Sequence, residues 1–240
     1  LAPRTPETSY LIARRWQLTN TRYLLGPAEY LESLNQQLDP ERRRFQISTR
    51  FDIVPKPEIT QAQQLQDLTA VINPNGQYAL FDFTGVLPRA CVFTGWQVET
   101  NDDTTLKTLA ARDFDPLKTV LVSTPVSAAP SASGPDAEPA EYKSYSPRTI
   151  VLSATAPAPS ILLLNDRYDP NWKVLVDGKP AELLRCNFIM RGVYLPPGAH
   201  TVEFRFRLPI GPFYFTLAGI ALAMILSGIL VVWTRKQRAN

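Results

Sequence analysis

One uncharged stretch near the C-terminus constrains this chain more than any other feature. Residues 213–233 read FYFTLAGIALAMILSGILVVW and carry no charge over 21 positions. A helix of that length covers about 30 Å at about 1.5 Å per residue, which matches the hydrocarbon core of a bilayer. Within a bilayer only a helix satisfies all of its backbone polar groups inside one segment. The stretch therefore predicts a transmembrane helix, with the buried core helix of a soluble protein as the alternative.

The flanks of this stretch predict its orientation. Phe213 and Tyr214 begin the apolar run and Trp233 ends it, as aromatic residues do at the two faces of a membrane. Three cations follow within residues 234–240. Because cationic flanks favour the cytoplasmic side, we expect a cytoplasmic basic tail there and an extracytoplasmic location for residues 1–210.

Composition narrows the class of protein. Net charge is +3 over 240 residues with both signs mixed, which gives no reason to expect a nucleic-acid partner. The 22 prolines favour β-rich or loop-rich structure. The chain starts at Leu1 without a signal-peptide pattern, so we expect a signal or earlier membrane helices upstream. Cys91 and Cys186 are predicted to be free buried thiols, and a disulfide is the alternative.

Residues 124–141, TPVSAAPSASGPDAEPAE, divide the extracytoplasmic part into two blocks. The segment is rich in Ala, Ser and Pro and has no aromatic residue. Such a composition buries too little apolar area to offset the entropy of ordering it. We therefore predict a linker or long loop between a first block, 1–123, and a second block, 142–208.

The first block mixes helix and strand patterns. Residues 27–38 and 102–111 place leucines at helical spacing, the former after a proline and the latter after two aspartates. Strand-like runs occupy residues 45–54, 78–83, 90–98 and 119–122. The block is therefore predicted to be α+β.

The second block is predicted to be a small antiparallel β-sandwich. Residues 172–176 and 181–185 flank an Asp-Gly pair at 177–178, which is typical of a hairpin, with Pro180 at an edge or in the loop. Residues 201–207, TVEFRFR, alternate strictly between apolar and polar side chains. The predicted fold class is an α+β block, then this sandwich over 142–208, then one C-terminal transmembrane helix over 213–233.

Few residues carry recognisable chemistry. His200 is the single histidine, and the sequence has no G-x-S-x-G elbow, phosphate loop or dinucleotide fingerprint. We therefore assign no catalytic residue, no metal site and no cofactor, and expect His200 to bond within a turn. Asp113 and Asp115, and likewise Asp166 and Asp169, precede or flank prolines, where aspartate makes turns. General acid–base chemistry is the alternative for each pair.

Tyr168, Trp172, Phe188 and Tyr194 form an aromatic set in the second block. Aromatic side chains on a sheet surface can stack on sugar rings, whereas in a small sandwich they also fill the core. Trp172 shares a predicted strand face with Val174, which favours the core. Both interpretations stay open.

Five stretches together resemble one family. Residues 166–178, DRYDPNWKVLVDG, resemble the Y-x-P-G-W-K-A-x-V-D-G segment of YfhO-type bacterial membrane proteins, with Asn171 in place of the usual glycine. Residues 185–207, RCNFIMRGVYLPPGAHTVEFRFR, resemble that family's R-A-N-Y-A-F-R-G-V and P-x-G-x-H-x-V-x-F-x-Y, with Cys186 where a small residue is common. Upstream, NTRYLL, LPRACV and RDFDPLKTVLV resemble N-V-R-Y-L-L, L-P-R-A-F-V and D-P-x-F-D-P-x-x-x-V-x-L, in the same order.

This resemblance implies the C-terminal extracytoplasmic part and last membrane helix of a multi-pass protein in the bacterial cell membrane. The family looks like GT-C-type glycosyltransferases, which use polyprenyl-linked sugars to modify cell-surface polymers. The implied partners are the lipid bilayer, upstream membrane helices of the same protein, and a polyprenyl-linked sugar or surface glycan. The implied catalytic carboxylate lies in an early loop outside this sequence, so the fragment is expected to be an accessory domain.

The matched residues look like determinants of the fold. They are Trp172, Asp177, Gly178, Asn187, Arg191, Gly192, Gly198 and His200. Tyr168, Trp172 and Arg191 are candidates for binding, and Arg191 is expected either to pair with a carboxylate or to support a loop. The alternative function is a non-catalytic, membrane-anchored carbohydrate-binding or structural β-sandwich module.

Overall fold

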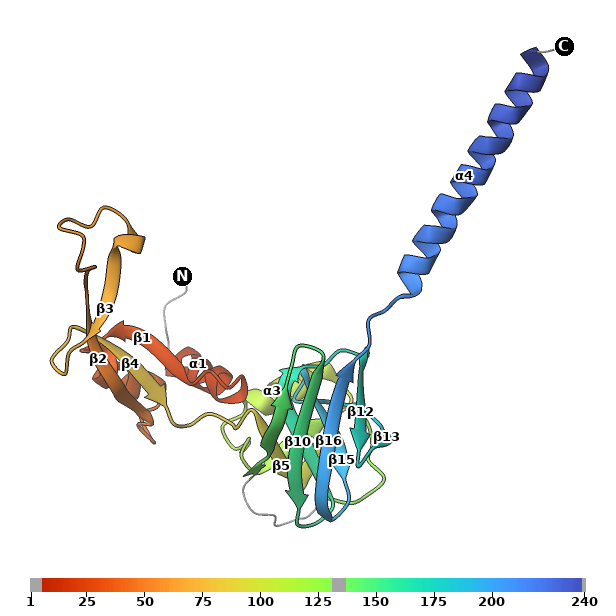
Figure 1. The fold of residues 1–240 in the computed structure, drawn as a ribbon. Helices are drawn as coiled ribbons and strands as arrows, with labels where there is room; N and C mark the ends of the chain where they lie inside the picture. Colours follow the sequence, from red (N-terminus) through yellow and green to blue (C-terminus); the bar gives the residue numbers. More distant parts are fainter. Residues whose placement is uncertain (1–5, 131–136, 239–240) are drawn as a thin grey trace.

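The computed structural model describes residues 6–130 and 137–238, which form three parts along the chain (Figure 1). A four-stranded sheet with two helices comes first, a β-sandwich follows, and a long C-terminal helix extends away from both. The predicted fold class, an α+β block, an antiparallel sandwich and one apolar C-terminal helix, is confirmed.

The first part is an antiparallel sheet in the order β1-β4-β2-β3. Its elements are α1 Pro6–Leu18, β1 Tyr23–Pro27, α2 Tyr30–Leu38, β2 Phe45–Pro55, a 3-10 turn Leu65–Asp67, β3 Leu68–Ile72 and β4 Tyr78–Phe83. Apolar residues of α1 and α2 pack on Phe45 and Phe83, whose rings stack at 4.5 Å. The buried Asn35 amide bonds both the backbone N–H and the carbonyl of Phe45, so α2 is fixed to the start of β2.

The sandwich consists of two sheets. One has the order β13-β12-β16-β10-β9, and the other β6-β7-β14-β15-β11-β5-β8. The elements are β5 Ala90–Phe93, β6 Gly95–Val98, α3 Asp102–Ala110, β7 Thr119–Val122, β8 Glu138–Pro139, β9 Glu141–Tyr145, β10 Thr149–Ala156, β11 Ser160–Arg167, β12 Trp172–Val176, β13 Lys179–Ala181, β14 Leu184–Cys186, β15 Met190–Leu195 and β16 Gly198–Phe206. Most pairs are antiparallel, whereas β6 and β7 pair in parallel through α3.

Two core clusters bury both faces of the seven-stranded sheet. The first lies between the sheets and includes Ile150, Leu152 and Phe204, each at most 1% exposed. The second lies on the other face and includes Phe93 and Trp96. Because both faces are covered, β11 reads as a continuous apolar run, whereas β10 alternates between buried and more exposed residues.

Strands from both sides of the boundary predicted at 124–141 lie in the same sheet. Strands β5, β6 and β7, from the predicted first block, lie in one sheet with β11, β14 and β15 from the second. Within the predicted linker, Val126, Ala128 and Ala137 pack against the second core cluster, and β8 pairs with β5. Residues 131–136 of that linker lie outside the described residues. The described residues of the segment therefore contribute apolar contacts to the sandwich.

The predicted Asp-Gly hairpin is present. Val176 pairs with Lys179 across the two-residue loop, and Asp177 and Gly178 have φ values of 51° and 78°. Positive φ at both central positions is the geometry that favours Asp-Gly in a hairpin. Pro180 lies in β13, at the sheet edge, where its missing N–H leaves the ladder intact.

Other residues of the family-like segments also occupy restricted positions. Gly192 faces Cys186 Sγ and the Leu162 carbonyl, each of which would lie 2.7 Å from an added Cβ. Asn187 has a φ of 43°, and its side-chain oxygen accepts the Leu121 N–H at 2.9 Å. These positions tolerate few other side chains, so the matched residues determine the fold here.

Helix α4 spans Gly211–Arg238 and contains an apolar segment, Phe213–Val231, long enough to cross a bilayer. None of that segment is buried against the described parts of the chain. Only residues 207–210 separate α4 from β16. The helix continues into the predicted basic tail, of which residues 239 and 240 lie outside the described residues.

Both cysteines are free and buried, as predicted. They belong to the second core cluster. Burial raises the pKa of the Cys91 thiol to about 12 and raises the pKa of Cys186 as well. Since the thiolate is the reactive form, both side chains are chemically protected in the folded chain.

Candidate functional site

Trp172 and Arg191, two of the predicted binding candidates, are brought together by the sandwich. Trp172 begins β12 in one sheet, and Arg191 lies in β15 of the other. The Arg191 guanidinium carbon lies 3.9 Å from the centroid of the Trp172 ring and 5.6 Å from that of Phe204. Arg191 is only 3% exposed, so this cation–π contact joins the two sheets inside the core.

Asp166 holds the guanidinium of Arg191 in place. Arg191 Nη2 donates to Asp166 Oδ2 at 2.9 Å, and Nη1 donates to the Arg167 carbonyl at 3.2 Å. Arg89 donates to the other carboxylate oxygen at 3.0 Å and lies over the Tyr145 ring at 4.7 Å. Burial lowers the pKa of Arg191, and the Asp166 charge opposes this effect. Of the two roles expected for Arg191, the structure shows the carboxylate pair.

A shallow cleft of about 340 Å³ opens beside this cluster. Trp172 is half-buried, packs against the first core cluster, and contacts Phe206 at 5.3 Å between ring centroids. Tyr168 does not line the cleft; its backbone N–H bonds the Ile189 carbonyl. With Arg191 over its ring, Trp172 has the contacts of a core residue, and its role in binding stays a prediction.

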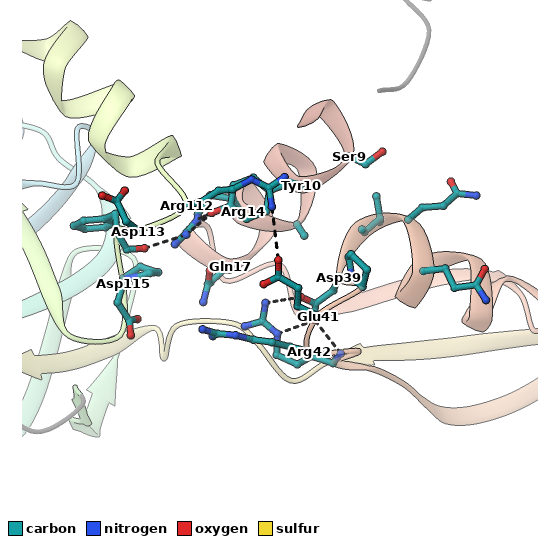
Figure 2. A pocket seen from close by; sticks show the side chains of 18 residues that line it. Ser9, Tyr10, Arg14, Gln17, Asp39, Glu41, Arg42, Arg112, Asp113 and Asp115 are labelled. Atoms are coloured by element: carbon teal, nitrogen blue, oxygen red, sulfur yellow. Dashed lines mark hydrogen bonds and ion pairs between the residues drawn. The ribbon is translucent and has the colours of Figure 1, made fainter. Parts of the chain in front are cut away.

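A larger cleft of about 550 Å³ lies between α1, the loop after α2, and residues 111–116 (Figure 2). Sequence analysis did not find it, because its walls come from three distant segments. The lining residues that carry charge are Arg14, Asp39, Glu41, Arg42, Arg44, Arg112, Asp113 and Asp115. Four arginines and four carboxylates leave the lining without net charge, and it presents both donors and acceptors.

Arg14 joins α1 to the loop at 111–116. Its Nη2 donates to the carbonyls of Phe114 at 3.0 Å and Ala111 at 3.3 Å, and its Nε donates to the Tyr10 hydroxyl at 3.0 Å. Arg14 is 8% exposed, and its Nη1 is buried without a partner among the described residues. The spacing of Tyr10 and Arg14, four residues apart on a helix, is the signal that could have indicated this pair.

Ion pairs form the opposite wall of the same cleft. Arg44 Nε and Nη2 donate to the two oxygens of Asp39 at 2.8 and 2.9 Å. Arg112 lies 3.8 Å from Glu41 and 4.6 Å over the Tyr10 ring. In Figure 2 the Arg112 side chain extends toward Glu41 from the far side of the cleft. The pair of Arg44 with Asp39 therefore lies within this wall, whereas the pair of Arg112 with Glu41 crosses the cleft.

Three of the four aspartates in the predicted pairs divide between two roles. Asp115 Oδ1 accepts the Leu117 N–H at 3.0 Å, and Asp169 Oδ1 accepts the Asn171 N–H at 2.7 Å, as turn-forming aspartates do. Asp166 differs, because it forms ion pairs with Arg89 and Arg191. The turn prediction is wrong for Asp166, since its partners lie far away in sequence.

His200 has the turn role expected of it. Its Nδ1 lies 2.7 Å from Asp177 Oδ2, and its Nε2 lies 2.9 Å from the Pro196 carbonyl. The Thr201 N–H donates to the other oxygen of Asp177 at 2.9 Å. These contacts fix the β12–β13 hairpin against β16. In the described part of the chain, no group of three side chains could hold a metal ion.

Comparisons with known proteins give little guidance. No family model matches the chain, and no curated protein matches it. Among solved structures it is similar to the cryo-EM structure of the arabinofuranosyltransferase AftD from mycobacteria, with 20% identity and a TM-score of 0.28. That match covers 41% of this chain and 8% of that chain. A likeness of this size carries no argument, so the function is inferred from the chain's own residues.

Proposed function

We propose that this chain is the extracytoplasmic region and last membrane helix of a multi-pass, YfhO-type protein of the bacterial cell membrane. The intact protein resembles glycosyltransferases that use lipid-linked sugars to modify surface polymers. In this proposal the chain is an accessory domain, and the catalytic carboxylate belongs to a loop outside this sequence. Its partners are the bilayer, upstream membrane helices and a polyprenyl-linked sugar or surface glycan.

The positions of the family-like residues carry this proposal. Asp177 and His200 bond each other, Asn187 bonds Leu121, and Gly192 leaves no room for a Cβ. Within the sandwich, these matched side chains hold turns and close contacts, which supports a shared fold and a shared context.

Helix α4 supports the membrane location. Its apolar side chains are widely exposed, among them Phe215 at 83% and Met224 at 65%. A soluble chain rarely leaves so large an apolar surface in water. A bilayer would cover it, and the aromatic residues at 213, 214 and 233 would lie near the two interfaces.

The sequence upstream of Leu1 in the complete gene tests this proposal. We expect several apolar spans of about 20 residues each, and an acidic loop after the first of them. A lone signal peptide upstream would contradict the multi-pass proposal while leaving the anchor intact.

The larger cleft favours a second function, a membrane-anchored carbohydrate-binding module. Its volume of about 550 Å³ lies within the usual range of ligand sites. A neutral polyhydroxylated ligand can bond arginines and carboxylates alike, and it needs no net charge in the lining. Such a ligand fits this cleft better than a phosphate does, because four carboxylates offset the four arginines and leave the lining without net positive charge.

Calorimetric titration of the full chain in detergent micelles with neutral oligosaccharides tests this second function. Arg112→Gln and Asp113→Asn are expected to weaken binding, while Arg22→Gln, which lies outside the cleft lining, is the matched control. Trp172→Ala should lower stability and leave saccharide affinity unchanged. Absence of binding, or loss of binding only in the folded Trp172 variant, would rule out the larger cleft as the site.

A further inference from the structure

The end of the sandwich from which α4 departs carries an excess of positive charge. The last residue of β16, Phe206, bonds the carbonyl of Arg148, and the next residue, Arg207, bonds the carbonyl of Asn171. Arg167 ends β11 at the same end, beside the Trp172 cleft. Three segments of the chain therefore bring Arg148, Arg167 and Arg207 around the point where the chain leaves the sandwich.

These three arginines are exposed, and within residues 6–130 and 137–238 none of them forms an ion pair. Of the nearby carboxylates, Asp166 lies between Arg89 and Arg191, and Glu203 is paired with Arg205. Asp169 lines the same cleft as Arg167 and accepts the Asn171 N–H, so its single negative charge offsets only part of the three positive ones. The acidic start of α3 follows β6, which is the far edge strand of the seven-stranded sheet. The uncompensated charge at the chain exit is therefore positive.

The connector keeps this surface close to the end of α4. Four residues, 207–210, join Phe206 to Gly211, so the two can be separated by at most about 17 Å. Within the connector, Leu208 and Ile210 are 52% and 56% exposed. When α4 crosses a bilayer, apolar connector residues and the three arginines must lie near the headgroup region.

We propose that Arg148, Arg167 and Arg207 form a docking surface for anionic phospholipid headgroups, which holds the sandwich against the membrane. Lipids with a net negative headgroup attract cations near the surface, and the attraction falls off within the screening length, about 10 Å at 0.1 M salt. Guanidinium groups bind phosphate oxygens through two parallel hydrogen bonds. The inference rests on the membrane anchoring of α4, and it adds the lipid class that this domain recognises.

Hydrogen exchange on the full chain in nanodiscs tests the docking surface. Discs of phosphatidylcholine alone are compared with discs that also contain phosphatidylglycerol. Residues 146–148 and 167–171 are expected to exchange more slowly in the anionic discs, and high salt should abolish the difference. Neutralising the three arginines should shift the docking equilibrium roughly a hundredfold, or about 3 kcal/mol.

Arg148→Gln, Arg167→Gln and Arg207→Gln are combined in the test variant. The control combines Lys107→Gln, Lys118→Gln and Lys179→Gln, which remove as much charge from exposed positions on α3, before β7 and on the edge hairpin. Equal exchange in both kinds of disc, or an equal effect of the control, would overturn the docking surface alone. Failure of the full chain to enter discs would contradict the anchoring on which it rests.

Discussion

The four-stranded sheet of the first part and the seven-stranded sheet of the sandwich differ in how many of their faces are buried. The seven-stranded sheet is buried on both faces, whereas the four-stranded sheet packs helices on one face and leaves apolar side chains such as Leu25 and Ile72 exposed at 73% and 78%. Burial is what makes a substitution costly. Most of the segments that resemble a family lie in the sandwich. Their resemblance therefore indicates the fold of the sandwich.

The largest expected difference between the regions concerns ion pairs. Arg191→Met removes a buried guanidinium from Asp166 and Trp172. We expect a loss of about 2 to 3 kcal/mol, below the full cost of breaking a buried pair because Asp166 keeps Arg89. Arg22→Met removes the exposed pair with Asp82 on the four-stranded sheet and is expected to change stability little. Urea denaturation of the full chain in detergent micelles measures both.

Equal losses in the two arginine variants would mean that the buried cluster adds no more stability than a surface pair. Arg191 would then not be a determinant of the fold.

Glycine substitutions test the same contrast through packing. At Gly192 a new methyl group would lie 2.7 Å from Cys186 Sγ and from the Leu162 carbonyl, and the backbone atom cannot move aside easily. Gly192→Ala is expected to destabilise the chain by about 1 to 2 kcal/mol. Gly26→Ala, in β1, meets Phe81 at an ordinary 3.6 Å and should have a small effect. Thermal unfolding of the two variants side by side decides the point, and a neutral Gly192→Ala would contradict the packing described.

The smallest expected effect concerns acid. The His200 ring and the Thr201 N–H lower the pKa of Asp177, and the Gln77 N–H and Asn73 amide lower that of Asp52 in the four-stranded sheet. A lowered pKa means that each carboxylate stabilises the fold above its unfolded pKa of about 3.9 and stops doing so as pH falls through its folded value.

Denaturation of wild type, Asp177→Asn and Asp52→Asn as a function of pH measures this acid effect. The difference between each variant and wild type should be constant above about pH 5 and shrink as pH falls below about 4. A difference that grows in acid would reverse the sign assigned to these pKa shifts.

Short-range patterns predicted much of the fold. Residues 78–83, 102–110 and 119–122 form the elements expected there, because periodicity and capping are local properties. The Asp-Gly hairpin followed from two adjacent residues that tolerate positive φ. In contrast, residues 90–98 form two strands, and α1, β3, β9 and β15 were not predicted.

Long-range pairing explains what sequence reasoning missed. No local signal says that β5 and β7 join the sheet of β11, since the contact crosses the Ala/Ser/Pro-rich segment. Three separate stretches of the chain supply Arg89, Asp166 and Arg191, so no local sequence pattern predicts their ion pairs. The larger cleft has the same origin, because it needs α1, the loop after α2 and residues 111–116 together.

Topology labelling tests the central proposal most directly. Cysteines introduced at the exposed positions Ser144 and Gln237 can be labelled with a membrane-impermeant maleimide in intact cells that make the complete protein. Cys91 and Cys186 add little background, because both are buried. We expect Ser144→Cys to react from outside and Gln237→Cys to react only after permeabilisation. Labelling of Gln237→Cys in intact cells, or protection of Ser144→Cys, would contradict an extracytoplasmic domain anchored by α4.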